Sequence, residues 1–363
     1  MTQYIPENIR SMEEYKPNSG VFRIRLDANE SPFPLSGGLK KKIESAVGGI
    51  MFNRYPDPGS EALISAFADR FNVDKSLVTA GNGSDELISL VFQSFTKYDD
   101  AVLTAMPDFS MYSFYPEVLG RRVIRYEKKY DRIDYDELYG LIRRENIKLI
   151  MFSNPCNPTG QLENAGEIAA LASECGCIVV CDEAYMEFSS KNESLLDRVS
   201  KFDNLIVLKT MSKAFGIASL RVGFAVTNKL FADTLKKIKS PYNVNSLSQE
   251  IARIILTDGY GELKAGYMAI SKEKFLLSSE IEKLCPALDA NQLKTETNFV
   301  VIDTPRAAKI FNGLADAGIA VRYFGGDSPR LRITCGSPEE NRELLSALRK
   351  IGLNNNERTG SKK

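Results

Sequence analysis

Short runs of consecutive apolar residues alternate with amphipathic stretches from about residue 76 to residue 228. The runs occupy residues 77–80, 101–105, 148–152, 177–181, 205–208 and 223–226. Apolar residues that follow one another without alternation are typical of strands covered on both faces, and intervening segments such as 85–95 and 165–175 have helical spacing. The pattern predicts an α/β fold with a mostly parallel central sheet flanked by helices.

The pattern changes after residue 241. A long helical stretch at 246–283 is followed by strand candidates at 298–303, 319–322 and 330–334, and by helices at 306–318 and 338–351. This order predicts a smaller α+β domain. We therefore expect an N-terminal arm that packs on the smaller domain, a large domain, a small domain and a disordered polar tail, at residues 1–45, 46–242, 243–353 and 354–363.

Composition narrows the class of partner. The chain has 363 residues, 43% of them hydrophobic, and its 47 Lys and Arg residues balance 47 Asp and Glu residues. This balance gives no electrostatic reason to expect nucleic acid or an acidic membrane as a partner, so small metabolites are favoured. Because the chain contains neither a run of about 20 apolar residues nor an N-terminal signal pattern, we expect a cytoplasmic protein.

The sequence contains no histidine. This excludes Ser-His-Asp triads, histidine-ligated zinc and histidine general bases, and leaves Lys, Tyr, Cys, carboxylates or a cofactor for proton transfer near neutral pH. The six cysteines lack the spacing of a zinc site, so we expect no metal. The six cysteines are predicted to be buried thiols rather than a disulfide framework: Cys156, Cys175, Cys177, Cys181, Cys285 and Cys335.

Three polar residues follow strand candidates directly. Asn157, Asp182 and Lys213 come after the runs at 148–152, 177–181 and 205–208. The carboxyl ends of the strands form the ligand site of an open α/β sheet, so these side chains are expected at one site. Arg221 lies eight residues after Lys213, and this combination suits a Schiff-base lysine beside a phosphate.

A glycine-rich turn at residues 80–88 follows a strand candidate and opens a helix. Backbone amides around Ser84 and Asp85 should therefore point at an anion, aided by the helix dipole. With Arg221 as a bidentate cation, this turn predicts a phosphate site.

Three segments carry a family resemblance: Ser153-Asn-Pro-Cys-Asn-Pro-Thr-Gly160, Val179-Val-Cys-Asp-Glu-Ala-Tyr185 and Leu208-Lys-Thr-Met-Ser-Lys-Ala-Phe-Gly216. In this order and spacing they resemble the fold-type I aminotransferases that use pyridoxal phosphate. The resemblance implies that Lys213 binds the cofactor covalently, that Asp182 keeps its ring nitrogen protonated, and that Tyr185 and Asn157 reach its phenolic oxygen. It implies stacking by Phe109, and phosphate contacts from Gly83, Ser84, Asp85, Thr210, Ser212 and Arg221.

The resemblance extends over nearly the whole chain and is sharpest to the histidinol-phosphate aminotransferases. It is carried by Leu26-Asp-Ala-Asn-Glu-Ser-Pro, Asn53-Arg-Tyr-Pro, Gly81-Asn-Gly-Ser-Asp-Glu-Leu-Ile and Arg330-Leu-Arg-Ile-Thr. It implies a homodimer with shared active sites, in which Tyr55 reaches the cofactor phosphate of the partner subunit. Arg332 would hold the substrate carboxylate or the equivalent end group, Arg322 and Tyr15 the distal phosphate, and Asn29 would also contact substrate.

The chain departs from the family pattern at Phe109, where tyrosine is common, at Cys156, where a polar residue is frequent, and at Ser219, where glycine is usual. None of these changes touches Lys213 or Asp182. The expected reaction converts L-histidinol phosphate and 2-oxoglutarate to imidazole acetol phosphate and L-glutamate. The alternatives are an aromatic aminotransferase, a threonine-phosphate decarboxylase, a non-catalytic sensor that binds the cofactor, and a redox or metal role for the cysteines.

Overall fold

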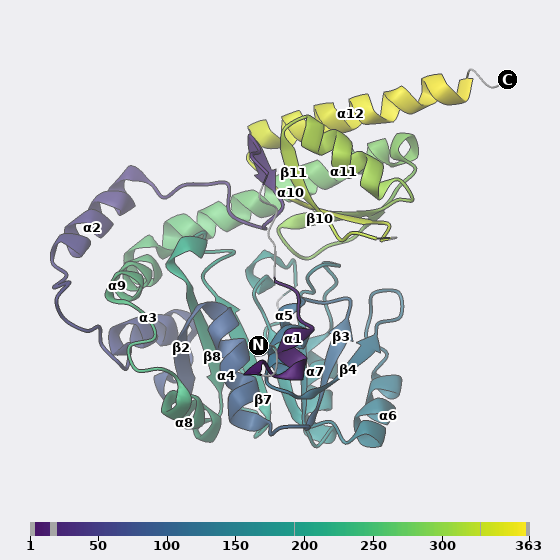
Figure 1. Ribbon diagram of the computed structural model, residues 1–363. Helices are drawn as coiled ribbons and strands as arrows, with labels where there is room; N and C mark the ends of the chain where they lie inside the picture. The colour runs from purple at the N-terminus through teal and green to yellow at the C-terminus, as the bar shows by residue number, and fades with distance from the viewer. Residues whose placement is uncertain (1–3, 15–19, 192, 327, 361–363) are drawn as a thin grey trace.

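Two β-sheets form the framework of the computed structural model, which describes residues 4–14, 20–191, 193–326 and 328–360 (Figure 1). The larger sheet has seven strands in the order β2-β8-β7-β6-β5-β3-β4. Their bounds are Val78–Asn82, Val222–Thr227, Leu205–Thr210, Ile178–Asp182, Leu149–Ser153, Ala101–Met106 and Arg122–Glu127. Only β8 runs against its neighbours, so the sheet is mostly parallel, as the sequence predicts.

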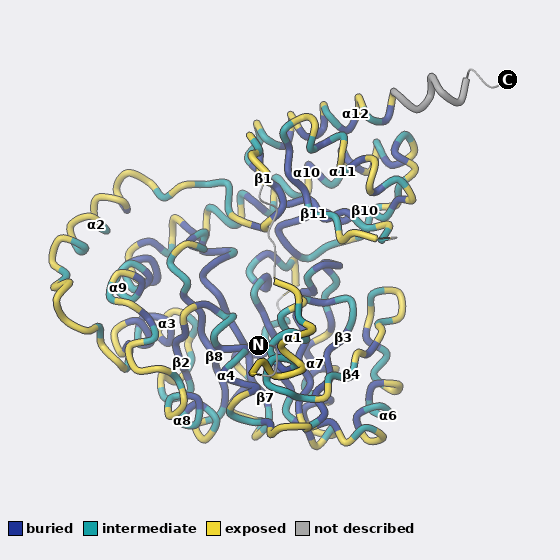
Figure 2. The backbone as a smooth tube through the Cα atoms, viewed as in Figure 1, coloured by how far each residue is buried: buried dark blue, intermediate teal, exposed yellow. Residues whose placement is uncertain are grey.

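Helices cover both faces of this sheet, which explains its apolar strands. Every residue of β5, β7 and β8 is buried, as a strand between two helical layers requires. One face packs on α4 (Gly83–Phe95), α5 (Met111–Val118) and α8 (Lys229–Ile238). The other packs on α3 (Glu61–Phe71), α6 (Tyr135–Glu145) and α7 (Ala165–Glu174). Figure 2 shows the strands of the larger sheet as buried, between the two layers of helices.

The smaller sheet has five strands in the order β1-β11-β12-β10-β9. Their bounds are Ile24–Leu26, Ile319–Tyr323, Arg330–Thr334, Phe299–Asp303 and Asn291–Leu293. It packs against α10 (Tyr260–Leu288) and α11 (Ala307–Asp316), and α12 (Pro338–Gly360) packs on these two helices. No helix in the described ranges combines the length and apolar character needed to cross a bilayer.

Polar side chains define where several helices begin. Asn164, Asn228 and Asn245 accept hydrogen bonds from backbone amides in the first turns of α7, α8 and α9 (Ser246–Ile254). Ser36 does the same for α2 (Gly37–Gly48). Such caps satisfy amides that have no partner within the helix, so these helix starts follow from local sequence.

The N-terminal segment contacts both parts of the molecule. The first strand, β1, pairs in parallel with β11 of the smaller sheet. The Asn8 amide of α1 (Glu7–Arg10), however, donates to backbone oxygens of Glu117 and Val118 at the end of α5. Within the expected arm at 1–45, α1 thus contacts helix α5 while β1 joins the smaller sheet, and the expected domain boundaries stay a prediction.

Two features of the structure differ from the expectations. The sequence does not predict the edge strand β4, because its polar and partly exposed residues form no apolar run. The long helix expected at 246–283 is interrupted by a π-helical turn, Ile255–Gly259, between α9 and α10. Helix α12 continues to Gly360, and the disorder expected at 354–363 stays a prediction. Residues 361–363 lie outside the described residues.

Candidate active site

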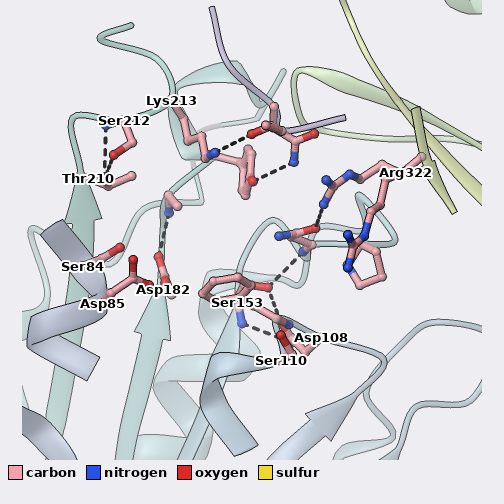
Figure 3. A pocket seen from close by; sticks show the side chains of 18 of the residues that line it. Ser84, Asp85, Asp108, Ser110, Ser153, Asp182, Thr210, Ser212, Lys213 and Arg322 are labelled. Atoms are coloured by element: carbon pink, nitrogen blue, oxygen red, sulfur yellow. Dashed lines mark hydrogen bonds between the residues drawn. The ribbon is translucent and has the colours of Figure 1, made fainter. Parts of the chain in front are cut away.

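A cavity of about 740 Å³ lies where the carboxyl ends of the larger sheet face the smaller sheet. Thirteen of the predicted site residues line it: Asn29, Ser84, Asp85, Phe109, Asn157, Asp182, Tyr185, Thr210, Ser212, Lys213, Arg221, Arg322 and Arg332. They come from distant segments, and Figure 3 shows ten of the lining residues by name around the cavity. The cavity therefore lies at the carboxyl ends of the strands, where a ligand site is expected in an open α/β sheet.

Lys213 follows β7 and presents its amine to the cavity. Its Nζ donates a hydrogen bond to the backbone oxygen of Ala28 at 2.9 Å (Figure 3). The same Nζ lies 6.0 Å from the centre of the Tyr185 ring. The Ala28 carbonyl and the Tyr185 ring therefore position the Lys213 amine, and neither contact involves a carboxylate.

Asp182 ends β6 and is buried in the wall of the same cavity. Its Oδ2 accepts from the Tyr112 hydroxyl at 2.8 Å, and its Oδ1 accepts from the Ala184 amide at 3.0 Å. Burial raises the pKa of Asp182 to about 7, and these two hydrogen bonds limit the rise. A buried carboxylate with this pKa is suited to hold a proton on a bound basic nitrogen.

Tyr185 is held by the N-terminal segment. The Asn29 side-chain amide donates to the Tyr185 hydroxyl at 2.8 Å. Asn29 itself is buried in the left-handed backbone region, with a φ of 56°, and its backbone N–H donates to the Thr334 hydroxyl at 3.0 Å. The residue therefore joins the cavity wall of the larger sheet to β12.

An anion cradle forms where α4 begins. Arg221 donates to the Asp85 carboxylate at 3.0 Å and to the Ser212 hydroxyl at 3.3 Å. A side-chain carbon at Gly83, whose φ is +80°, would overlap the Arg221 guanidinium. A side-chain carbon at Gly223 would lie 2.6 Å from the Ser84 amide nitrogen. Glycine at both positions lets the guanidinium and the first turn of α4 lie together, an arrangement that favours a phosphate.

The hydroxyls of Thr210 and Ser212 extend this anion cradle. The Thr210 hydroxyl donates to Ser212 Oγ at 3.1 Å, and the Ser212 amide donates to Thr210 Oγ1 at 3.2 Å. The Asp85 carboxylate faces Arg221, so Asp85 can offer an anion only its backbone amide. The carboxylate instead fixes the direction of the guanidinium.

Two arginines from neighbouring strands approach the cavity from the smaller sheet. Arg322 of β11 and Arg332 of β12 are paired in register. Arg332 is buried, donates to the Asp27 backbone oxygen at 2.7 Å and also donates to the Asn157 side-chain oxygen. Arg322 lies over the Phe324 ring at 5.8 Å. These guanidinium groups give this end of the cavity a positive charge suited to anionic substrate groups.

The sequence of this chain is similar to those of known aminotransferases. The sequence family described as aminotransferase class I and II matches residues 23–348. The chain is also 38% identical to proteins named histidinol-phosphate aminotransferase from Clostridium novyi and Thermoanaerobacter pseudethanolicus. These matches cover 94% and 96% of this chain, and 96% and 99% of the relatives.

The chain belongs to the aminotransferase class I and II family. The fold agrees as well. A crystal structure of histidinol-phosphate aminotransferase from Sinorhizobium meliloti, in complex with pyridoxal-5'-phosphate, superposes with a TM-score of 0.86 at 24% identity. It covers 96% of this chain and 97% of that chain.

Three predicted residues do not line the cavity. Gly83 lies directly behind its wall, against Arg221. Tyr55 is 81% exposed and stacks on Tyr242, with ring centres 4.6 Å apart, beside a different cavity. Tyr15 lies outside the described residues, so its expected substrate contact stays a prediction.

The sequence did not reveal a buried ion pair beneath the aminotransferase cavity. Lys128 donates to Asp108 at 3.0 Å, to the Pro107 backbone oxygen at 3.2 Å and to the Cys156 sulfur at 3.1 Å. Burial alone disfavours the charged amine, but the Asp108 carboxylate and the Cys156 sulfur raise the pKa of Lys128 above its ordinary value. The unusual Cys156 therefore completes the contacts of a buried lysine.

This ion pair is connected to the site by a chain of hydrogen bonds. The Asp108 carboxylate accepts hydrogen bonds from the hydroxyl and the backbone amide of Ser153. The Ser153 hydroxyl in turn accepts from the backbone amide of Asn157 at 3.0 Å (Figure 3). Asn157 in turn accepts from Arg332. Asp108 could have been noticed because it follows the run at 101–105, whereas Lys128 follows the unpredicted strand β4.

We expect Ser153→Ala to reduce kcat/KM about tenfold. The backbone amide of Asn157 loses its acceptor, so the Asn157 side chain, which accepts from Arg332, is held less firmly. Steady-state kinetics and thermal unfolding would be compared with Ser113→Ala, which removes a hydroxyl bonded to Thr104 at 3.2 Å outside this chain of hydrogen bonds. Equal effects of the two substitutions on kcat/KM would contradict a positioning role for Ser153.

Proposed function

We propose that this aminotransferase moves the amino group of L-histidinol phosphate to 2-oxoglutarate with pyridoxal phosphate as its cofactor. One observation carries the proposal: a single cavity joins a lysine amine, a buried carboxylate and an anion cradle to two arginines on the opposite sheet. The proteins named histidinol-phosphate aminotransferase, similar over nearly the whole chain, support the choice of substrate.

The residues present fit the cofactor. The glycines at 83 and 223 leave room for Arg221 and the start of α4 to enclose a phosphate. Asp182 offers a buried carboxylate to the ring nitrogen, and Lys213 offers an amine to the aldehyde. When bound, pyridoxal phosphate supplies an aldehyde that condenses with amines and a protonated ring that withdraws electrons from the carbon bearing the amine.

The residues around this group have separate roles in the reaction. Lys213 would hold the cofactor through its side-chain amine, and the same amine is placed to take a proton from the substrate carbon. Asp182 would keep the ring nitrogen protonated, and the hydrogen bond from Tyr112 orients the Asp182 carboxylate. Tyr185, fixed by Asn29, and Asn157, fixed by Ser153, are placed to contact the ring oxygen. Phe109 lies in the cavity wall, where its ring can stack on the cofactor.

The positive end of the cavity sets the substrate class. Arg322 and Arg332 together supply two guanidinium groups, enough for the phosphate of an amino alcohol phosphate or the two carboxylates of 2-oxoglutarate in turn. An aromatic aminotransferase that uses 2-oxoglutarate would need the same two groups. The preference for the phosphorylated substrate is therefore supported by the relatives named histidinol-phosphate aminotransferase.

We expect Arg322→Ala to lower kcat/KM for L-histidinol phosphate about 30- to 100-fold and that for phenylalanine less than about twofold. Removing a charge-assisted bidentate hydrogen bond to the phosphate costs roughly 2–3 kcal/mol. Turnover of both substrates would be measured, with Arg322→Lys as a variant that keeps the charge without the fork. Equal losses on both substrates would sink the assignment of Arg322 to phosphate.

We also propose a homodimer with shared sites. The segment from α2 to Tyr55 is largely exposed (Figure 2), and Phe52 in it is 71% exposed. Large apolar side chains gathered on one surface favour a protein interface. The position of Tyr55 outside the cavity of its own subunit supports a contact with the cofactor phosphate of the partner subunit. Mixing two variants that each lack one residue of the shared site, Lys213 or Tyr55, tests this assembly.

A further inference from the structure

Two cysteines lie side by side where α7 meets β6. Cys175 caps the carboxyl end of α7, and Cys177 directly precedes β6. Gly176 between them has a φ of +67°, in the left-handed region that glycine adopts freely. A side-chain carbon at Gly176 would meet nothing within 4 Å. The turn therefore borders open space and has room to adjust.

The two sulfur atoms are nearly in bonding position. The Cys177 thiol donates to the Cys175 sulfur, with a sulfur–sulfur distance of 3.3 Å. A disulfide bond needs a separation of about 2.05 Å, so the sulfurs would have to approach by only about 1.2 Å. Small rotations of the two cysteine side chains, together with a small adjustment of the unobstructed turn at Gly176, can supply this movement.

The environments of the two thiols differ. Cys175 is partly exposed, whereas Cys177 and the remaining four cysteines are buried. The Cys175 sulfur also lies 3.5 Å from the Cys177 amide, which donates to it. The carboxyl end of a helix disfavours negative charge, but the hydrogen bond from the Cys177 thiol lowers the pKa of Cys175 to about 7. Cys175 is thus the accessible nucleophile and Cys177 the shielded one.

We propose that Cys175 and Cys177 form a reversible thiol–disulfide exchange site for low-molecular-weight disulfides, with Cys175 as the attacking thiol and Cys177 as the resolving thiol. The site is separate from the catalytic cavity, since neither cysteine lines it. The proposal does not depend on the proposed function.

The exchange proceeds in two balanced steps. The Cys175 thiolate attacks one sulfur of the small disulfide, forms a mixed disulfide and releases one small thiolate, which takes up a proton. Cys177 then loses its proton and attacks the Cys175 sulfur, which forms the Cys175–Cys177 bond and releases the second small thiol. Two protein thiols are oxidised and one small disulfide is reduced to two thiols.

The test uses the full chain and oxidised glutathione as the probe. Thiol titration, intact mass and peptide mapping should show that the wild-type protein loses two thiols and the mass of two hydrogens, with the new bond between Cys175 and Cys177. Dithiothreitol should restore both thiols. Cys177→Ser should stop at a stable glutathione adduct on Cys175, while Cys175→Ser should react at least about tenfold more slowly.

Three results would overturn the proposal: a persistent glutathione adduct on the wild-type protein, a disulfide that joins other cysteines, or Cys175→Ser reacting as fast as the wild type. Circular dichroism would verify that each variant is folded. Cys177→Ala serves as a second variant if the serine hydroxyl disturbs the buried position, and it should stop at the same adduct.

Discussion

Lys213→Ala is expected to lower kcat by at least about 10⁴-fold. In the proposed mechanism, the substitution removes both the amine that would bind the cofactor and the group that would move the proton at the substrate carbon, and each role alone contributes orders of magnitude. The hydrogen bond from this side chain to the Ala28 backbone oxygen is made by the same amine, so it disappears as well. Turnover and visible absorption after addition of pyridoxal phosphate would be measured together.

Lys229→Ala is the matched control, because Lys229 is an exposed lysine paired with Asp233 at 2.6 Å on α8. It should retain wild-type turnover and absorption. A Lys213→Ala protein that kept a tenth of the wild-type rate would refute the assignment of Lys213 as the catalytic lysine.

Mixing Lys213→Ala with Tyr55→Ala protein extends this experiment to the assembly. If Tyr55 of the partner subunit completes each site, random pairing at equal amounts leaves about a quarter of the sites with both native residues. Activity at limiting cofactor should then rise above that of either variant alone. No gain after subunit exchange would argue against shared sites.

Asp182→Asn is expected to have opposite effects on activity and on stability. It should lower kcat about 10²- to 10³-fold, because a neutral amide cannot hold the ring nitrogen in its charged form. The same substitution should stabilise the cofactor-free protein at high pH. Asparagine can still accept from the Ala184 amide and bond to Tyr112, without the cost of a buried charge.

The sign of this pH effect follows from proton linkage. The pKa of Asp182 is raised from 3.8 to about 7, so between these values the folded protein holds a proton that the unfolded chain has lost. Stability therefore falls as the pH rises through this window, by about 4 kcal/mol when complete. The melting temperature of Asp182→Asn should exceed that of wild type by several degrees at pH 8.5, and this excess should shrink as the pH falls toward 4. A difference that does not vary with pH would contradict the raised pKa.

Burial on both faces explains why most of the larger sheet could be predicted. Strands β5, β7 and β8 contain uninterrupted apolar residues because helices cover both of their faces. Strand β4 lies at the sheet edge, and charged residues at three of its six positions interrupt its apolar residues, so its sequence carries no comparable signal. Likewise, nothing local in residues 246–283 indicates the π-helical turn, where Leu39 of α2 packs against Gly259.

Only part of the candidate site could be predicted from the sequence. Asn157, Asp182 and Lys213 could be placed together because each follows a strand of one sheet. The ion pair between Lys128 and Asp108 could not, since it joins two segments 20 residues apart across the ends of β3 and β4. The direction of the Asp85 carboxylate could not be predicted either, because its partner Arg221 lies 136 residues away.

The pairing of β1 with β11 joins Ile24 to Ile319. During synthesis on the ribosome, at about 5–20 residues per second, β1 must wait roughly 15 to 60 seconds for its partner to emerge. Throughout that interval Ile24 and Leu26 have no sheet to cover them, and the backbone oxygen of Ala28 is not yet fixed beside Lys213. The nascent enzyme is thus expected to acquire activity only after nearly the whole chain has been released, and a chaperone that binds short apolar segments would find its target within the first thirty residues.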